Sequence, residues 1–237
     1  MTFKKYLTES VILDFSNDAI QALIRSRGWE KMDEFDRIGA AYDFVRNEIK
    51  FGYNHADNLP ASKVLRDKYG QCNTKGNLLM ALLRALDIPC RFHGFTIDNQ
   101  LQKGAIPNYL FWLAPKHILH SWVEVIFEGD WINLEGFILD EPYLTSIQDR
   151  QSDNCGAYKG YAIATPCLQK PEVDWVGKST YIQREGIHDD FGVFDTPDAF
   201  YSAHGTNLKG LKRILFQNMF RHMMNRNLDK IRNETRA

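Results

Sequence analysis

The stretch from Tyr69 to Cys90 constrains this chain most strongly, because a glycine, a cysteine and a nearly all-apolar helix follow one another in it. Gly70 brings the chain into a sharp turn, Cys72 follows almost at once, and apolar residues from Leu78 to Leu86 lie on nearly every side of the helix. We expect a buried central helix with a thiol in its first turn. Unpaired backbone N–H groups and the positive end of the helix dipole favour a thiolate there, which predicts a lowered thiol pKa and a nucleophilic sulfur.

A lone cysteine is more often a core residue than a nucleophile, so the chemical hypothesis needs a base and a group that orients the base. A predicted hairpin supplies both, with strands at Ile118–Phe127 and Trp131–Glu135 around a turn at Glu128-Gly129-Asp130. His120 stands near the start of the first strand and Glu135 ends the second. Antiparallel pairing is expected to bring the imidazole and the carboxylate to the same end of the ribbon.

The composition narrows the class of protein. With 237 residues, a net charge of −1 and a pI near 6.7, the chain does not resemble a dedicated nucleic-acid binder. No signal-peptide pattern and no apolar run long enough for a membrane span are found, so we expect a soluble, cytoplasmic protein. No C-x-x-C pair occurs, so neither a disulfide framework nor a zinc site is expected, and no cofactor or metal is predicted. The cysteines are Cys72, Cys90, Cys155 and Cys167.

The remaining chain predicts scaffold around this centre. Helical spacing indicates helices at 17–27 and 33–50, a strand is expected at 91–97, and 98–116 reads as a long irregular insertion. Residues 136–201 are predicted to be rich in loops. A long basic amphipathic helix is predicted from Asn207 to Arg236. We expect residues 1–206 to form one domain and the helix of 207–237 to dock on it. The alternative is contact with a membrane surface or an acidic partner.

Three ordered blocks of the sequence resemble the transglutaminase-like superfamily, whose core has the papain-like cysteine-enzyme fold. The resemblance implies an α+β domain, with a core at about residues 33–136, in which the nucleophile helix packs on an antiparallel sheet. It also implies that Cys72 is the nucleophile and His120 the base. Glu135 occupies the place of the family's usual aspartate, and Asp140 and Glu141 are competing candidates for the carboxylate. The blocks are Tyr69-Gly70-Gln71-Cys72, the run from Leu82 through Arg91 to Gly94-Phe95, and His120-Ser121-Trp122-Val123-Glu124-Val125 with Trp131-Ile132-Asn133-Leu134-Glu135.

Acyl transfer also needs donors for a tetrahedral oxyanion. We expect the backbone N–H of Cys72 to be one donor. A side chain upstream of the cysteine is the family's usual second donor, and Tyr53 is the first candidate here, with Asn54 the second.

The resemblance implies thiol-dependent acyl transfer from a protein or peptide amide through a thioester. Hydrolysis is favoured over transamidation, because water is abundant and no amine pocket can be identified in the sequence. No acidic cluster has the spacing of calcium ligands, so the calcium dependence of animal transglutaminases is not carried over. The rival hypothesis is a binding module whose catalytic core has decayed, with Glu135 in place of aspartate as the sign of decay.

Overall fold

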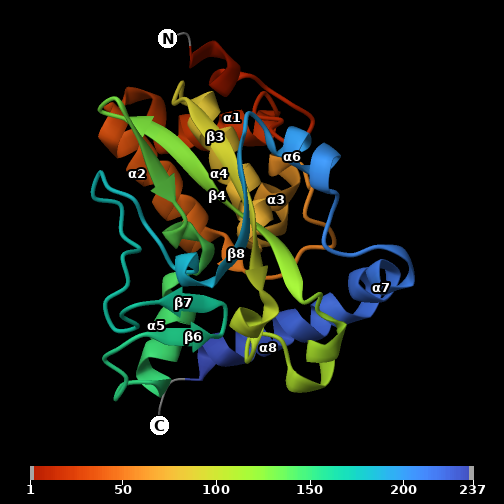
Figure 1. Cartoon of the computed structure of the whole chain (residues 1–237). Coiled ribbons are helices and arrows are strands. Elements are labelled where there is room, and N and C mark those ends of the chain that lie inside the picture. The colour runs from red at the N-terminus through yellow and green to blue at the C-terminus, as the bar shows by residue number, and fades with distance from the viewer. Residues whose placement is uncertain (1–2, 235–237) are drawn as a thin grey trace.

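A four-stranded antiparallel sheet forms the centre of the computed structural model, which describes residues 3–234. The strand order is β5-β4-β3-β8. The β3–β4 register places Phe95 opposite His120, and β4 turns into β5 at the predicted hairpin. Helices cover this sheet, which confirms the α+β class expected from the sequence (Figure 1). The strands are β3 (Cys90–Asp98), β4 (His117–Phe127), β5 (Asp130–Leu134) and β8 (Ile187–Phe194).

Helix α4 (Cys72–Ala85) is the central buried element that the sequence predicts. All its residues from Asn73 to Arg84 are buried, and it packs against β4. A Cβ on Gly70 would lie 2.6 Å from the Thr74 hydroxyl, so only glycine lets the chain enter the helix this closely. Three further helices pack around α4, namely α1 (Asp18–Arg27), α2 (Glu34–Asp43) and α3 (Ala61–Asp67), and a short parallel pair of β1 (Lys50–Phe51) and β2 (Tyr69–Gly70) precedes it.

The segment predicted to be loop-rich contains more regular structure than expected. Its strand β8 adds to the main sheet beside β3, with Phe92 opposite Phe194. Most of β8 is exposed or half-buried, so it lacks the alternation of apolar and polar residues by which a strand is recognised. The other elements there are α5 (Glu141–Arg150), the paired β6 (Tyr158–Gly160) and β7 (Ile163–Thr165), and α6 (Pro197–His204).

Helix boundaries also differ from the predicted ones. The helix expected at 33–50 ends as a π-helical turn at Phe44–Glu48. The carboxy-terminal helix is divided into α7 (Gly210–Leu215), a π-helical turn at Phe216–Phe220 and α8 (Arg221–Asn233). Its predicted last residues, 235–236, lie outside the described part of the chain. The insertion of 98–116 carries short 3-10 helices at Asn99–Gln102 and Asn108–Leu113.

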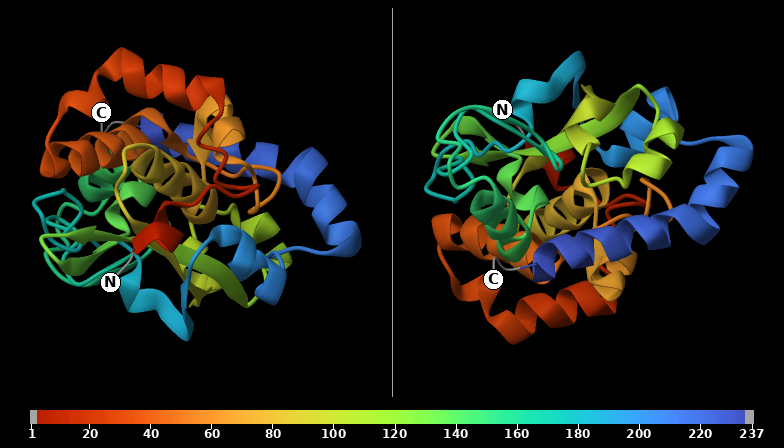
Figure 2. Two further views of the ribbon diagram at one scale, coloured as in Figure 1. Left: turned by 90° about the horizontal axis from the view of Figure 1, so that it is seen from above. Right: turned by 90° about the horizontal axis from the view of Figure 1, so that it is seen from below.

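Helix α8 lies across the end of the sheet next to α5, as both views of Figure 2 and the contacts between these helices show. A buried ion pair joins α8 to the start of α5. Arg232 donates to both carboxylate oxygens of Asp140, at 2.8 and 2.9 Å, and to the Phe51 carbonyl at 2.6 Å. Burial alone would raise the pKa of Asp140, but the hydrogen bonds and charge of Arg232 lower it below the ordinary value. The pair therefore fixes the carboxy-terminal helix on the domain.

Replacing Arg232 by methionine is expected to destabilise the protein by about 3 kcal/mol, because Asp140 would remain buried without its charged partner. Urea unfolding at pH 7 measures the change in the free energy of unfolding. Arg226→Met is the matched control, since Arg226 is an exposed arginine of the same helix. Equal stability of the two variants would show that the ion pair does not hold α8 in place.

Candidate active site

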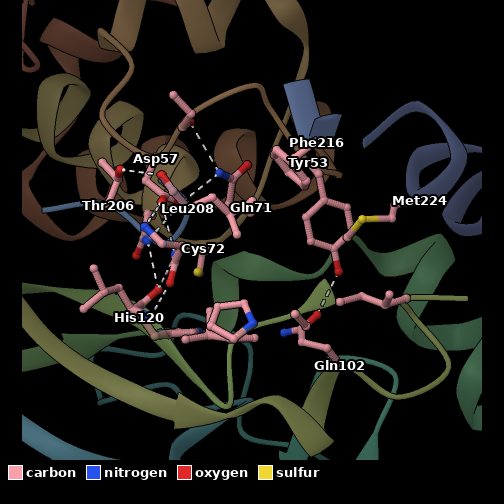
Figure 3. A pocket seen from close by; sticks show the side chains of 18 of the residues that line it. Tyr53, Asp57, Gln71, Cys72, Gln102, His120, Thr206, Leu208, Phe216 and Met224 are labelled. Carbon is pink, nitrogen blue, oxygen red and sulfur yellow. Dashed lines mark hydrogen bonds between the residues drawn. The ribbon is translucent and has the colours of Figure 1, made fainter. Parts of the chain in front are cut away.

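Cys72 and His120 line one cavity, which lies between the start of α4, the start of β4, the 98–116 insertion and the carboxy-terminal helix. The Cys72 sulfur is above the imidazole of His120 in the close-up of Figure 3. The chain enters α4 through Gln71 in an extended conformation, and the Gln71 side chain does not cap the helix. The backbone N–H groups of the first turn have no partner within the helix, so they remain available near the thiol.

Asn73 brings the cysteine and the histidine together. Its side-chain amide donates to the Leu119 carbonyl at 3.1 Å and accepts from the Ser121 hydroxyl at 2.9 Å. Leu119 and Ser121 are the two neighbours of His120 on β4, and Asn73 directly follows Cys72. Because both hydrogen bonds involve the fully buried Asn73 side chain, the start of α4 is held against β4 at the height of His120. Nothing in the local pattern of the sequence singles out Asn73, since its two partners are 46 and 48 residues away.

His120 is fully buried, stacks on Phe95 and forms a hydrogen bond through Nε2 with the side-chain oxygen of Gln183. The orientation of the Gln183 amide is fixed because its nitrogen donates to the Ala162 carbonyl at 2.6 Å. The amide oxygen must therefore accept from the imidazole, which assigns the proton to Nε2. Nδ1 is then the basic nitrogen of the neutral ring, and it has no hydrogen-bond partner within residues 3–234.

Glu135 does not make the predicted hydrogen bond to His120. The register pairs Val123 with Leu134, so Glu135 follows at the level of Trp122 and not of His120. One oxygen of the Glu135 carboxylate accepts from the backbone N–H groups of Ile182 and Gln183, at 2.9 and 3.0 Å. Glu135 thus anchors the backbone of the residue whose side chain contacts the imidazole. Its second oxygen, like His120 Nδ1, has no partner in the described chain.

The two competing carboxylates lie elsewhere. Asp140 is buried, but it binds Arg232 and caps α5 by accepting from the Tyr143 N–H. Glu141 is exposed. Neither lines the cavity that holds His120.

Tyr53 and Asn54, the expected oxyanion donors, are engaged in other hydrogen bonds. The Tyr53 hydroxyl lines the cavity and donates to the Gln102 side chain at 2.8 Å. The Asn54 amide donates to the Tyr69 carbonyl at 3.1 Å, and its oxygen accepts from Thr74 at 2.7 Å. Among the predicted donors, the backbone N–H of Cys72 is the one that these contacts leave free for an oxyanion.

Electrostatics contradict the expectation of a lowered thiol pKa. Burial raises the pKa of the Cys72 thiol, and the charge of Asp57 adds to this increase, while the backbone N–H groups of Asn73 and Ser121 oppose it. Cys72 is half-buried and lines the cavity. Burial lowers the pKa of His120 to about 4, although the hydrogen bond that His120 donates to Gln183 opposes this shift. Both pKa shifts favour the neutral forms of the thiol and the imidazole.

Several polar residues of the site carry no sequence signal. Asp57 accepts from the backbone N–H and from the side-chain amide of Asn207. The side-chain oxygen of Asn207 accepts from the Leu119 N–H. Gln102 contacts Tyr53 from the insertion, and Gln183 contacts His120 from the loop before β8.

Within residues 3–234, no group of three or more His, Cys, Asp or Glu side chains is placed to hold a metal ion. None of the helices described is long and apolar enough to cross a membrane.

Comparison with known families gives the class of this site. Residues 21–136 match the model of the Transglutaminase-like superfamily. The matched segment contains α4, β3, β4 and β5, and with them Cys72, His120 and Glu135. The resemblance found in the sequence is therefore confirmed: this part of the chain matches the transglutaminase-like superfamily, a family of cysteine-based enzymes.

Among solved structures, the chain is similar to the crystal structure of a "Putative Cysteine Protease" from Cytophaga hutchinsonii, with 15% sequence identity and a TM-score of 0.46. The match covers 83% of this chain and 48% of the other, so the chain spans about half the length of that protein. No curated protein sequence matches the chain.

Replacing Gln183 by leucine is expected to slow alkylation of Cys72 by iodoacetamide about tenfold or more at pH 7, because the imidazole loses the acceptor that sets its tautomer. Gln183→Glu keeps an acceptor and should retain most of the rate. Gln148→Leu is the control, since that glutamine bonds a backbone carbonyl and does not line the cavity. If Gln183→Leu reacts normally and Glu135→Gln reacts slowly, Glu135 and not Gln183 orients the imidazole.

A further prediction concerns the pH dependence of stability. Burial raises the pKa of Glu135 from 4.5 to about 7, against the opposing N–H groups of Gln183 and Ile182. A carboxyl whose folded pKa is raised stabilises the fold below the unfolded pKa and loses this contribution as pH rises through the folded pKa. Wild type should therefore lose up to about 3 kcal/mol relative to Glu135→Gln between pH 4.5 and pH 8.

Urea unfolding of both proteins across this pH range measures the difference. Glu141→Gln serves as the control, since Glu141 is exposed and a matching variant there should follow wild type at every pH. A difference between wild type and Glu135→Gln that stays constant with pH would mean that Glu135 ionises at its ordinary pKa.

Proposed function

We propose that this protein is a thiol enzyme that transfers the acyl group of a protein or peptide amide to water through a thioester on Cys72. One observation carries the proposal: Asn73 holds the nucleophile and the base at one cavity, while Gln183 occupies Nε2 of His120 and leaves Nδ1 free. A free basic nitrogen beside a thiol is the arrangement that general-base activation of sulfur requires.

The neutral state of both groups determines how the first step proceeds. His120 Nδ1 accepts the thiol proton as the Cys72 sulfur attacks the carbonyl carbon, and the carbonyl electrons move to oxygen. The backbone N–H of Cys72 donates to that oxyanion. When the tetrahedral intermediate collapses, the C–N bond breaks and the imidazolium returns its proton to the leaving amine. A thioester remains on Cys72.

The second half-reaction uses the same residues with water in place of the thiol. His120 accepts a proton from water as the water oxygen attacks the thioester. When the C–S bond breaks, the imidazolium returns this proton to the Cys72 sulfur, which releases a carboxylic acid and restores the free thiol. The imidazolium exists only during each half-reaction, and the amide oxygen of Gln183 stabilises it by accepting from Nε2–H. Glu135 contributes by holding the Gln183 backbone.

Hydrolysis is proposed ahead of transamidation, because a transamidase must bind an amine and exclude water from the thioester. The alternative, a binding module with a decayed core, is weakened by Gln183. The replacement of the usual aspartate by Glu135 would signal decay only if the imidazole lacked an acceptor, and Gln183 supplies one.

All four cysteines are free, which supports the proposal of a cytoplasmic protein.

Incubation with a panel of small amide and activated ester substrates tests the proposal. Cys72→Ala should lower turnover by a factor on the order of 10³ or more, and His120→Ala by about 10² or more. Mass spectrometry of wild type should detect an acyl group on Cys72. Cys155→Ala is the control, because Cys155 is an exposed thiol outside the cavity and should not affect turnover.

Added glycinamide distinguishes the two acceptors. Release of free acid at an unchanged rate supports hydrolysis, whereas conversion of the acyl group to its glycinamide product supports transamidation. Turnover that survives in Cys72→Ala would overturn the proposal, and silence of the wild-type protein towards all donors would favour the binding module.

A further inference from the structure

The cavity at Cys72 has a polar and an apolar part. In Figure 3, Asp57, Gln71 and His120 lie on the side of the thiol, whereas Tyr53 and Met224 extend away from it. The apolar part, called the chamber below, is formed by side chains from three separate regions of the chain. They are Ile97, Ile106, Leu110, Phe216, Phe220 and Met224.

The walls of the chamber are held from outside by polar contacts. Asn225 of α8 accepts from the Tyr53 N–H at 2.7 Å and donates to the Tyr53 carbonyl at 3.2 Å. Asn227 donates to the carbonyls of Gly104 and Ala105, at 2.9 and 2.8 Å. Together with the Arg232–Asp140 pair, these bonds fix α8 against the insertion, so the chamber is formed before any ligand binds.

The chamber offers few polar groups to a ligand. The Tyr53 hydroxyl and the Gln102 oxygen satisfy one another in the wall. The cationic lining residues Lys212 and Arg213 are exposed, which places their charges at the solvent side. A polar or charged group inside the chamber would lose water without gaining a partner, whereas an apolar group would gain free energy by leaving water.

From this chamber we infer the substrate class: the acyl side of the amide carries a single aromatic ring or an unbranched chain of about six carbons, and the chamber holds that group. The inference rests on the proposed function of Cys72. Size supports it, since the whole cavity measures about 130 Å³, close to the ~150 Å³ of a cavity that accepts a benzene ring. The acyl group stays on the enzyme through both half-reactions, while the amine leaves and water enters. A preformed apolar chamber suits the part that stays.

A series of anilides tests the inference on the full-length protein. We expect kcat/KM to rise roughly fourfold for each added methylene from acetanilide to hexananilide, and to level off or fall at dodecananilide. Phenylacetanilide should match hexananilide. Met224→Asn should remove most of the gain of hexananilide over acetanilide, so that the ratio of their kcat/KM values falls towards one. Met219→Asn is the control, because Met219 is an exposed methionine in the π-helical turn before α8 and does not line the cavity.

Binding provides a readout that does not require chemistry. Hexananilide should raise the melting temperature of Cys72→Ala, and acetanilide at the same concentration should not. If hexananilide stabilises Cys72→Ala while wild type never forms an acyl-enzyme, the chamber stands and the proposed function fails. If an acyl-enzyme forms but acetanilide reacts as fast as hexananilide, the proposed function stands and the apolar acyl group is overturned. If neither binding nor turnover occurs, both are overturned.

Discussion

The two hydrogen bonds of the Asn73 side chain are the constraint on which the site depends. They join α4 to both neighbours of His120, and they lie in a buried environment where an unpaired amide would be costly. Sliding β4 along α4 by one residue would break both bonds and would also turn His120 to the opposite face of the sheet. The thiol and the imidazole are thus kept together by the same contacts that fix the packing of the central helix.

Much of the fold could be predicted from the sequence, because the elements that build it have strong local patterns. The apolar helix after Cys72 and the hairpin around Gly129 are recognisable from periodicity and turn residues alone. The match of Cys72 and His120 to family motifs placed both in the correct elements. Strand β8 was missed because it lies at the sheet edge, where exposed residues remove the alternating pattern.

The hydrogen-bond partners within the site could not be predicted in the same way. Gln183 meets His120 across 63 residues, and the loop that delivers it has no periodic pattern. Glu135 stands where the resemblance places the carboxylate, yet its oxygen binds backbone N–H groups that no motif encodes. The thiol pKa was wrongly expected to fall, because the helix-terminus argument considers only the favourable dipole and omits the larger effect of burial. Helix position alone does not fix the charge of a cysteine.

Burial of Cys72 and His120 raises the free-energy cost of charging the thiol and the imidazole. A preformed thiolate–imidazolium pair would place two charges in a poorly solvated pocket, and desolvation would cost more than their attraction returns unless further partners were present. A neutral pair avoids that cost in the resting enzyme. In the proposed mechanism, charge appears only when a substrate carbonyl is present to accept the electrons of sulfur, and Gln183 is already oriented to stabilise the imidazolium at that moment.

The structure also separates chemistry from selectivity along the chain. The segment matched by the family model supplies the thiol, the imidazole and the helix–strand contact that joins them. Residues after 136 supply Gln183 and the α8 wall of the chamber, so they bear on both the orientation of the base and the shape of the acyl site. Because α8 is held by the buried Arg232–Asp140 pair, the two asparagine contacts and its packing on α5, changes in this helix can alter the chamber without breaking the Asn73 bonds between α4 and β4. In the proposed enzyme, selectivity for the acyl group can therefore change while Cys72 and His120 remain where the core holds them.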